Sequence, residues 1–111
     1  MNTDWPKELN LAITIMDADG TIIYMNDKSA KTFEKDGGKE LVGKKLNICH
    51  TERSNQIISK LLNNKETNTY TIEKNGVKKL IYQTPWYENE KCMGLIEFSI
   101  EIPFEIPHFL R

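Results

Sequence analysis

Two neighbouring residues near the middle of the chain, Cys49 and His50, have the side chains best suited to chemistry. An imidazole can ligate a metal or transfer a proton near neutral pH, and a thiolate can act as a nucleophile. Side chains that adjoin in sequence point to different sides of most backbones, and no Asp or Asn is visibly placed to orient the histidine. The alternative is a partly buried histidine satisfied by hydrogen bonds, which is the commoner role of a single histidine.

No stronger catalytic pattern is present in the sequence. It contains no Gly-x-Ser-x-Gly, no glycine-rich phosphate loop and no His-Glu-x-x-His. A chain of 111 residues forms one domain, with one core and room for at most one small pocket. We therefore expect a binding function rather than an enzyme.

Charge and composition limit the partners. The 15 basic and 16 acidic residues nearly cancel, and only Arg53 and Arg111 can form the bidentate contacts that read bases or clamp phosphates, so nucleic acid is disfavoured. No stretch is apolar enough for a membrane span, and the N-terminus lacks the regions of a signal peptide. Two cysteines without metal-type spacing are expected to be reduced thiols. Together these features predict a cytoplasmic protein without a membrane partner.

The N-terminal part predicts a β-hairpin followed by a helix. Large apolar residues alternate over 11–15, which is the period of a strand with one buried face. Residues 17–20, Asp-Ala-Asp-Gly, supply the chemistry of a tight turn, and a β-branched strand follows over 21–25. Asn26 stands between strand and helix, so we expect it to cap a helix that runs through Glu34.

The middle of the chain predicts short helices. Residues 39–46 favour a helix broken at a glycine, and residues 46–50 favour a connector. Thr51 is a suitable N-cap for an amphipathic helix that ends at Asn63-Asn64 and whose apolar residues are Ile57, Ile58, Leu61 and Leu62.

The last third predicts three strands. Asn75-Gly76 is the strongest two-residue signal for a hairpin, and Pro85 is expected at a strand end or bulge of the return strand over 77–86. In the strand that Pro103 closes, Ile96, Phe98, Ile100 and Ile102 face one way, and Glu97, Ser99 and Glu101 the other. The order β-β-α-α-α-β-β-β, without βαβ alternation, indicates an α+β fold with short helices on one face of an antiparallel sheet.

Three segments resemble the PAS domain family. Residues 15–26, Ile-Met-Asp-Ala-Asp-Gly-Thr-Ile-Ile-Tyr-Met-Asn, are similar to its first hairpin with an Asp-x-x-Gly turn and a closing Asn. Residues 40–46, Glu-Leu-Val-Gly-Lys-Lys-Leu, resemble the stretch after its first helix, and the last three strands resemble its meander. The resemblance implies five antiparallel strands in spatial order 2-1-5-4-3, with the helices forming a pocket on one face. The expected divisions are an N-terminal flanking segment (1–10), the PAS domain (11–102) and a C-terminal tail (103–111).

The resemblance implies a sensory or interaction module in signal transduction. Such modules are attached to histidine kinases, cyclic-dinucleotide enzymes or transcription factors, so regulation of transcription is among the expected outputs. The module would bind a small ligand or a protein partner between sheet and helices and relay that event through dimer contacts. Flanking segments commonly mediate PAS dimers, and we expect a homodimer held by Trp5, Leu9 and the tail over 104–110.

The candidate pocket residues are one histidine and the apolar and aromatic side chains expected beside the cavity: His50, Tyr24, Phe33, Ile57, Ile58, Leu61, Tyr70, Tyr82 and Trp86. For any single aromatic among them, filling the core is the alternative role. The lysines Lys44, Lys45, Lys78 and Lys79 are expected to form a solvated face.

A cofactor is the alternative to an ordinary ligand. Haem-binding members of the family ligate iron through a histidine near the start of the long helix, about where His50 lies. The alternative function is therefore a haem- or flavin-dependent redox or gas sensor that uses His50. Covalent flavin photochemistry is excluded, because Leu46 stands three residues after Gly43 where the adduct cysteine belongs.

Overall fold

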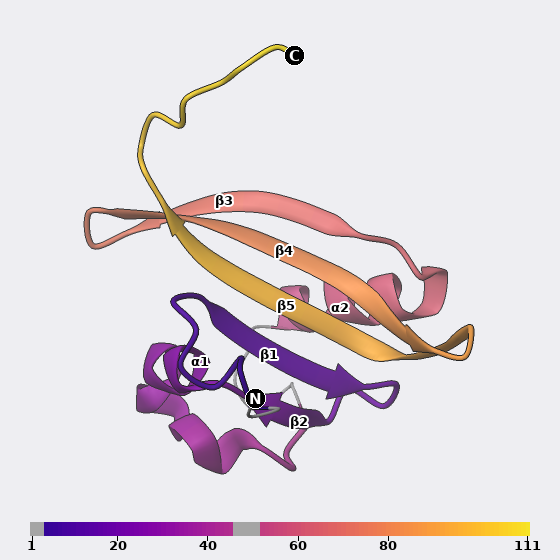
Figure 1. The fold of residues 1–111 in the computed structure, drawn as a ribbon. Coiled ribbons are helices and arrows are strands. Elements are labelled where there is room, and N and C mark those ends of the chain that lie inside the picture. Colours follow the sequence, from indigo (N-terminus) through magenta and orange to yellow (C-terminus); the bar gives the residue numbers. More distant parts are fainter. Residues whose placement is uncertain (1–3, 46–51) are drawn as a thin grey trace.

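One antiparallel sheet of five strands carries the helices on one side (Figure 1). The computed structural model describes residues 4–45 and 52–111, except for the side chains of 52–55 and 57. The strands are β1 (Ala12–Asp17), β2 (Ile22–Met25), β3 (Asn68–Lys74), β4 (Val77–Glu88) and β5 (Lys91–Ile102). The helices are α1 (Asp27–Thr32), the short 3₁₀ turns η1 (Glu34–Asp36) and η2 (Gly38–Leu41), and α2 (Glu52–Asn64). The sheet order is β2-β1-β5-β4-β3, which confirms the predicted α+β fold and its strand order.

Both predicted hairpin turns form through the residues that predicted them. The Asp17 carboxylate accepts hydrogen bonds from the backbone N–H groups of Asp19 at 2.9 Å and Thr21 at 3.1 Å. Asn75 and Gly76 both have positive φ, 53° and 77°, as a type I′ turn requires. These local turns set the pairing of β1 with β2 and of β3 with β4.

Asn26 is fully buried and uses its whole amide to join three segments. Its Oδ1 accepts hydrogen bonds from the backbone N–H of Ser29 at 3.0 Å, which caps α1, and from that of Ile13 at 2.9 Å in β1. Its Nδ2 donates to the carbonyls of Pro6 at 3.0 Å and Leu11 at 2.7 Å. The predicted capping role is confirmed, and Asn26 also fixes the N-terminal segment against the sheet.

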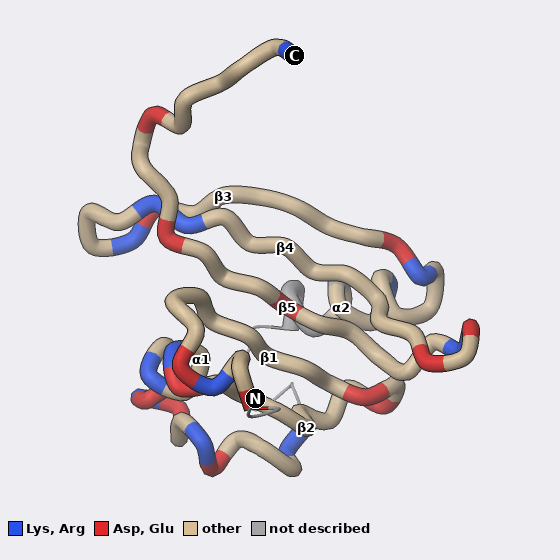
Figure 2. The backbone as a smooth tube through the Cα atoms, viewed as in Figure 1, with Lys and Arg blue, Asp and Glu red and all other residues tan. Residues whose placement is uncertain are grey.

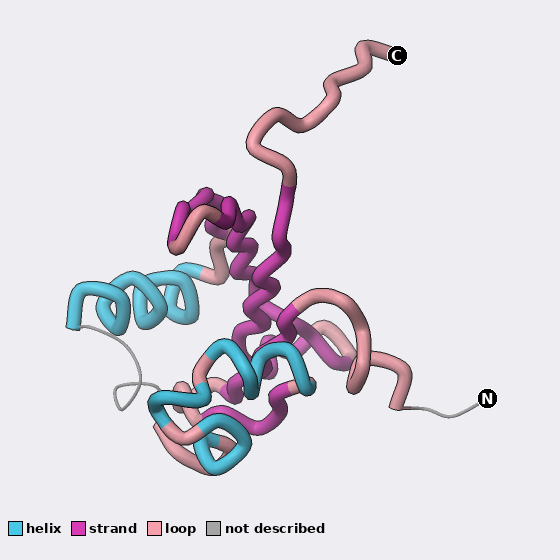
Figure 3. Tube along the Cα trace, turned by 90° about the vertical axis from the view of Figure 1, so that its left-hand side faces the viewer, coloured by secondary structure: helices cyan, strands magenta, loops and turns pink. Residues whose placement is uncertain are grey.

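The apolar core fills one end of the space between sheet and helices. It consists of buried side chains from the first hairpin, η2, α2 and β5: Met16, Ile22, Met25, Leu41, Ile58, Leu61 and Leu95. Phe33 and Leu62 pack against this cluster. In the edge-on view of Figure 3, α2 lies on one side of the sheet and the N-terminal segment leaves on the other. The core therefore belongs to the helix-facing side.

Three local predictions differ from the structure. The first helix ends at Thr32, and the described part of the predicted second helix, residues 39–45, contributes only to the 3₁₀ turn η2. The chain then forms an isolated bridge between Lys45 and Thr21, just before β2. Pro85 lies inside β4, just before a bulge at residues 86–87. Pairing with β3 ends at Gln83, so among the described strands Pro85 has only β5 beside it, where it lies opposite Leu95. The predicted connector over 46–50 and the cap Thr51 lie outside the described residues.

Candidate ligand-binding groove

Strand pairing decides which side chains of the sheet face the helices. Met16 and Leu95 are directly paired and both lie in the core with Ile58 of α2, so their side of the sheet faces the helices. Because side chains alternate along a strand, Glu97 on β5 and its partner Thr14 on β1 lie on this same side. Ile96, Phe98, Ile100 and Ile102 therefore lie on the outer side.

A row of polar side chains crosses the helix-facing side beyond the core. The Asn68 amide on β3 donates to Gln83 Oε1 on β4 at 3.1 Å, and Gln83 Nε2 donates to Glu97 Oε2 at 2.8 Å. Further along, the Thr14 hydroxyl is hydrogen-bonded to the Ser29 hydroxyl of α1. Gln83, Thr14 and Ser29 are buried, so each of these bonds prevents the loss that an unpaired polar group would cause.

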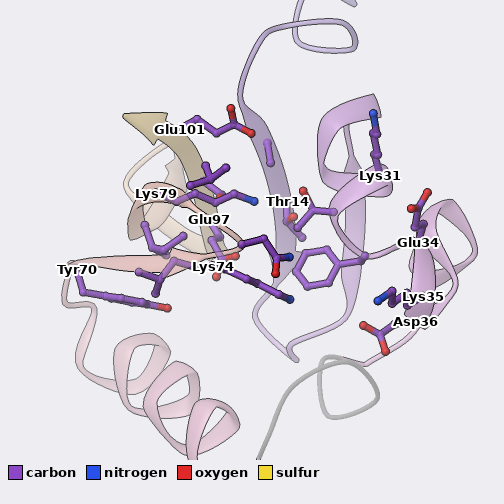
Figure 4. Close-up of a pocket in the computed structure, with 18 residues that line it drawn as sticks. Thr14, Lys31, Glu34, Lys35, Asp36, Tyr70, Lys74, Lys79, Glu97 and Glu101 are labelled. Carbon is purple, nitrogen blue, oxygen red and sulfur yellow. The ribbon is translucent and has the colours of Figure 1, made fainter. Parts of the chain in front are cut away.

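An open groove of about 590 Å³ lies over this row, between α1 and η1 on one side and β3, β4 and β5 on the other. Figure 4 shows Lys31, Glu34, Lys35 and Asp36 on the helical wall, and Tyr70, Lys74 and Lys79 on the sheet wall. Glu97 and Thr14 lie between the two walls. The charged lining comprises the carboxylates of Glu34, Asp36, Glu97 and Glu101 and the ammonium groups of Lys31, Lys35, Lys74 and Lys79. Formal charges therefore cancel around a polar groove.

Tyr70 connects the aromatic and the acidic parts of the groove. Partial burial raises the pKa of its phenol, and the negative charge of Glu97 raises that pKa further. The phenol therefore stays protonated at neutral pH. It can donate a hydrogen bond while its ring offers an apolar surface.

The predicted pocket residues separate into three groups. Phe33 and Tyr70 line the groove. Ile58 and Leu61 are buried in the core, where they support the sheet rather than border open space. His50 lies outside the described residues, as does the side chain of Ile57. A ligand role for any of these residues stays a prediction.

Tyr24, Tyr82 and Trp86 lie on the outer side of the sheet and do not border the groove. Tyr82 pairs with Phe98, their ring centroids 6.5 Å apart, and Tyr24 pairs with Ile15. The Trp86 indole lies opposite Gly94 and donates from Nε1 to the Met16 carbonyl at 3.1 Å. The sequence interpretation placed all three residues beside the cavity because aromatic character alone does not reveal which face of a strand a residue occupies.

Sequence reasoning missed the polar floor of the groove. Glu97 on the floor, and Gln83 and Asn68 that hold it by hydrogen bonds from beside the groove, were not among the predicted site residues. Lys79 was assigned to a solvated face although it lines the groove. A signal was present in the sequence, because the polar residues Glu97, Ser99 and Glu101 occupy every second position of an otherwise apolar strand. This signal did not show whether the polar residues face the helices, because alternation defines two faces of a strand without showing which of them meets the helices.

The outer side of the sheet presents half-buried apolar side chains instead. Ile96, Phe98, Ile100 and Ile102 of β5 lie there next to Leu80 of β4. Figure 2 shows charged residues mainly at the turns and helices rather than along the middle of these strands. The tail continues from β5 away from the sheet (Figure 1), with Phe104 and Ile106 about half exposed and Phe109 71% exposed. Large apolar surfaces of this kind mark contact sites.

The described walls do not fit haem. A haem needs a large apolar cavity, whereas the groove carries eight charged side chains and the apolar end of this space is filled by the core. Among the lining residues that the structure describes there is no histidine or cysteine to ligate iron. That His50 ligates iron stays a prediction, because His50 lies outside the residues that the structure describes.

The described ranges offer neither a metal cluster nor a membrane span. Residues 4–45 and 52–111 contain no group of three or more His, Cys, Asp or Glu side chains placed to hold a metal ion. In those same ranges no helix is long and apolar enough to cross a membrane.

Comparison with known proteins places the fold. The sequence matches no family model and no curated protein. The PAS domain of histidine kinase ThkA superposes with a TM-score of 0.67 at 20% identity, over 83% of this chain and 99% of that chain. The Aer2 receptor from Vibrio cholerae, a dual PAS-haem oxygen sensor, gives 0.62 at 20% identity, over 84% and 95% of the two chains. VqmA bound to DPO gives 0.67 at 14% identity, over 86% of this chain and 54% of that one.

These similarities establish that the chain has the PAS fold, as the order of its motifs predicts. At this level of identity they speak for the fold alone, so the function must be argued from the groove and the surface.

Proposed function

We propose that this chain is a sensory module of signal transduction that binds a small ligand in the groove and relays the event through a homodimer. The observation that carries the proposal is the groove of about 590 Å³, whose polar floor is held in place by hydrogen bonds to a buried glutamine. Sites for small molecules are concave and combine apolar walls with a few fixed polar groups. Among the lining residues that the structure describes, no side chain resembles an activated nucleophile, and this supports the proposal of binding rather than catalysis.

The relay is proposed to pass through the outer side of the sheet. Trp5, Leu9 and the tail residues Phe104, Ile106 and Phe109 expose apolar side chains, and the tail continues directly from the end of β5. A stable dimer buries about 800 Å² on each partner, which an apolar sheet face together with two flanking segments can supply. A ligand that changes the packing between helices and sheet would bias this interface.

For the output partner we propose only a class of protein. A histidine kinase, a cyclic-dinucleotide enzyme and a transcription factor are the candidates, and the likeness to the PAS domain of a histidine kinase supports the first. We place the protein in the cytoplasm, without a nucleic acid or membrane partner of its own. Regulation of transcription would then follow from the attached output.

Sedimentation velocity tests the dimer. The unmodified chain is expected to sediment as a dimer at micromolar concentration, and the triple variant Phe104→Ser, Ile106→Ser, Phe109→Ser as a monomer. Ile23→Ser with Val42→Ser is the matched control, because it removes exposed apolar side chains from the edge strand β2, which β1 separates from β5, and from the residue after η2. The control should remain dimeric. A monomeric unmodified chain would contradict the relay.

A further inference from the structure

The floor of the groove holds a carboxylate in a defined orientation. Glu97 Oε2 accepts the Gln83 amide bond at 2.8 Å, and Gln83 is itself fixed by Asn68 at 3.1 Å. Gln83 is only 3% exposed, so this donor cannot be replaced easily by water. The hydrogen bonds leave Glu97 Oε1 without a partner among the residues that the structure describes. The floor therefore presents one negative oxygen to whatever occupies the groove.

Four lysines line the groove, but none neutralises this carboxylate. Within the described part of the chain Glu97 forms no ion pair, although Lys39 and Lys7 both pair with Asp27 elsewhere. In Figure 4, Lys31 and Lys35 lie on the helical wall, Lys74 and Lys79 lie on the sheet wall, and Glu97 lies between the walls. Glu97 is partly exposed and faces the open groove, so a cation in the groove can reach its second oxygen.

Apolar side chains also line the groove, among the charged ones. Phe33 on one wall and Tyr70 on the other line the groove, with Ile81 and Ala12 between them. Aromatic rings attract cations through their faces and also pack against the apolar body of a ligand. The same groove thus offers a negative oxygen at its floor and aromatic surfaces on both walls.

We propose that the groove binds a small ligand with a protonated amine, whose ammonium group contacts Glu97 and whose apolar part packs between Phe33 and Tyr70. The inference rests on the proposed function and specifies the ligand class of that site. The amine donates to Glu97 Oε1, while the Gln83 bond keeps the carboxylate in place. Charge-assisted bonds of this kind are roughly twice as strong as neutral ones, so the charge decides which ligands are accepted.

Two probes of similar shape and opposite charge test the ligand class. 2-Phenylethylamine and 3-phenylpropanoate share a phenyl ring and a two-carbon linker. Each is titrated into the unmodified chain, with binding followed by calorimetry and by NMR of the side chains of Tyr70, Phe33 and Ile81. We expect the amine to bind at these residues at least tenfold more tightly than the acid.

Glu97→Gln tests the contact itself. The variant keeps an oxygen that can accept the Gln83 bond, so it should fold, yet it should weaken amine binding at least tenfold. Glu73→Gln is the matched control, because Glu73 is exposed on the outer side of β3 and loses the same charge. It should change amine affinity less than twofold.

The outcomes separate this inference from the proposed function. If 3-phenylpropanoate binds in the groove as tightly as the amine or more tightly, the positive charge of the lysines determines which ligands bind. The amine inference is then wrong and the ligand site stands. Unchanged amine affinity in Glu97→Gln also overturns the inference. If neither probe perturbs any groove residue, the ligand site is contradicted together with the inference.

Discussion

The two sides of β5 present opposite chemistry within one strand. On the helix-facing side Leu95 is fully buried in the core, but the next residues on that side are Glu97, Ser99 and Glu101. On the outer side the apolar residues of the strand remain half-buried with no layer of helices over them. An ordinary two-layer fold places the apolar side against the helices. This chain does so only at the Leu95 end.

This difference indicates a division of tasks along the sheet. Where α2 covers the sheet, apolar packing supplies stability through Leu95, Ile58 and Leu61. Beyond α2, the helix-facing side is polar and open, which suits a small polar ligand. The outer side is apolar and incompletely covered, which suits a second protein surface.

Gly94→Ala is expected to have the largest effect, because it disturbs the packing on both sides of β5. A Cβ at Gly94 would collide with the Met16 carbonyl oxygen, and φ of 148° also disfavours any other residue there. β5 would have to move away from β1, disturbing both the core and the Trp86 indole that bonds to Met16. We expect a loss of about 4 kcal/mol in the free energy of unfolding, measured by thermal or urea denaturation.

Gly20→Ala provides the control for that prediction. Gly20 also has positive φ, 81°, but no atom lies within 4 Å of the point that a Cβ would occupy there. Its substitution should cost only about 1 kcal/mol for the backbone conformation. Equal losses at the two positions would show that close approach of β5 to β1 is not what requires Gly94.

A smaller effect is expected from making the polar side apolar with Gln83→Leu. The change deprives the Glu97 carboxylate and the Asn68 amide of their partner, so we expect the free energy of unfolding to fall by about 2 kcal/mol although an apolar residue enters a buried site. Amine affinity should fall as well, because Glu97 is no longer held. Chemical denaturation and calorimetry with 2-phenylethylamine measure the two effects.

Thr71→Val on the outer side completes the comparison and should have the smallest effect. Thr71 is exposed and pairs with Leu80, so a valine of the same shape should change the free energy of unfolding by no more than about 0.5 kcal/mol. A larger loss at Thr71 than at Gln83 would reverse the proposed roles of the two sides.

The fold was predictable because local residues specify its turns and caps. Asp17 and the Asn75-Gly76 pair act through their own backbone neighbours, as does Asn26 where it caps α1 at Ser29, so these roles follow from sequence spacing. The bonds of Asn26 to the distant backbone of Pro6, Leu11 and Ile13 do not. The strand order came from the resemblance to PAS domains and is confirmed by the pairing.

The groove was not predictable to the same extent, because it depends on contacts between distant strands. Phe33 and Tyr70 were identified as pocket candidates and line the groove, whereas Tyr82 and Trp86 lie on the other side. The direction of β5 side chains depends on Leu95 pairing with Met16, which lies far away in the sequence. A periodic pattern cannot supply that register.

The most direct test of the division between the two sides is a methyl NMR spectrum of the chain labelled at isoleucine. Ile72 and Ile81 line the groove, while Ile100 and Ile102 lie on the outer side. Dilution should produce its largest shifts at Ile100 and Ile102, as a dimer dissociates, and 2-phenylethylamine its largest shifts at Ile72 and Ile81. Shifts that are independent of concentration, or largest at the same methyl groups in both titrations, would contradict the account.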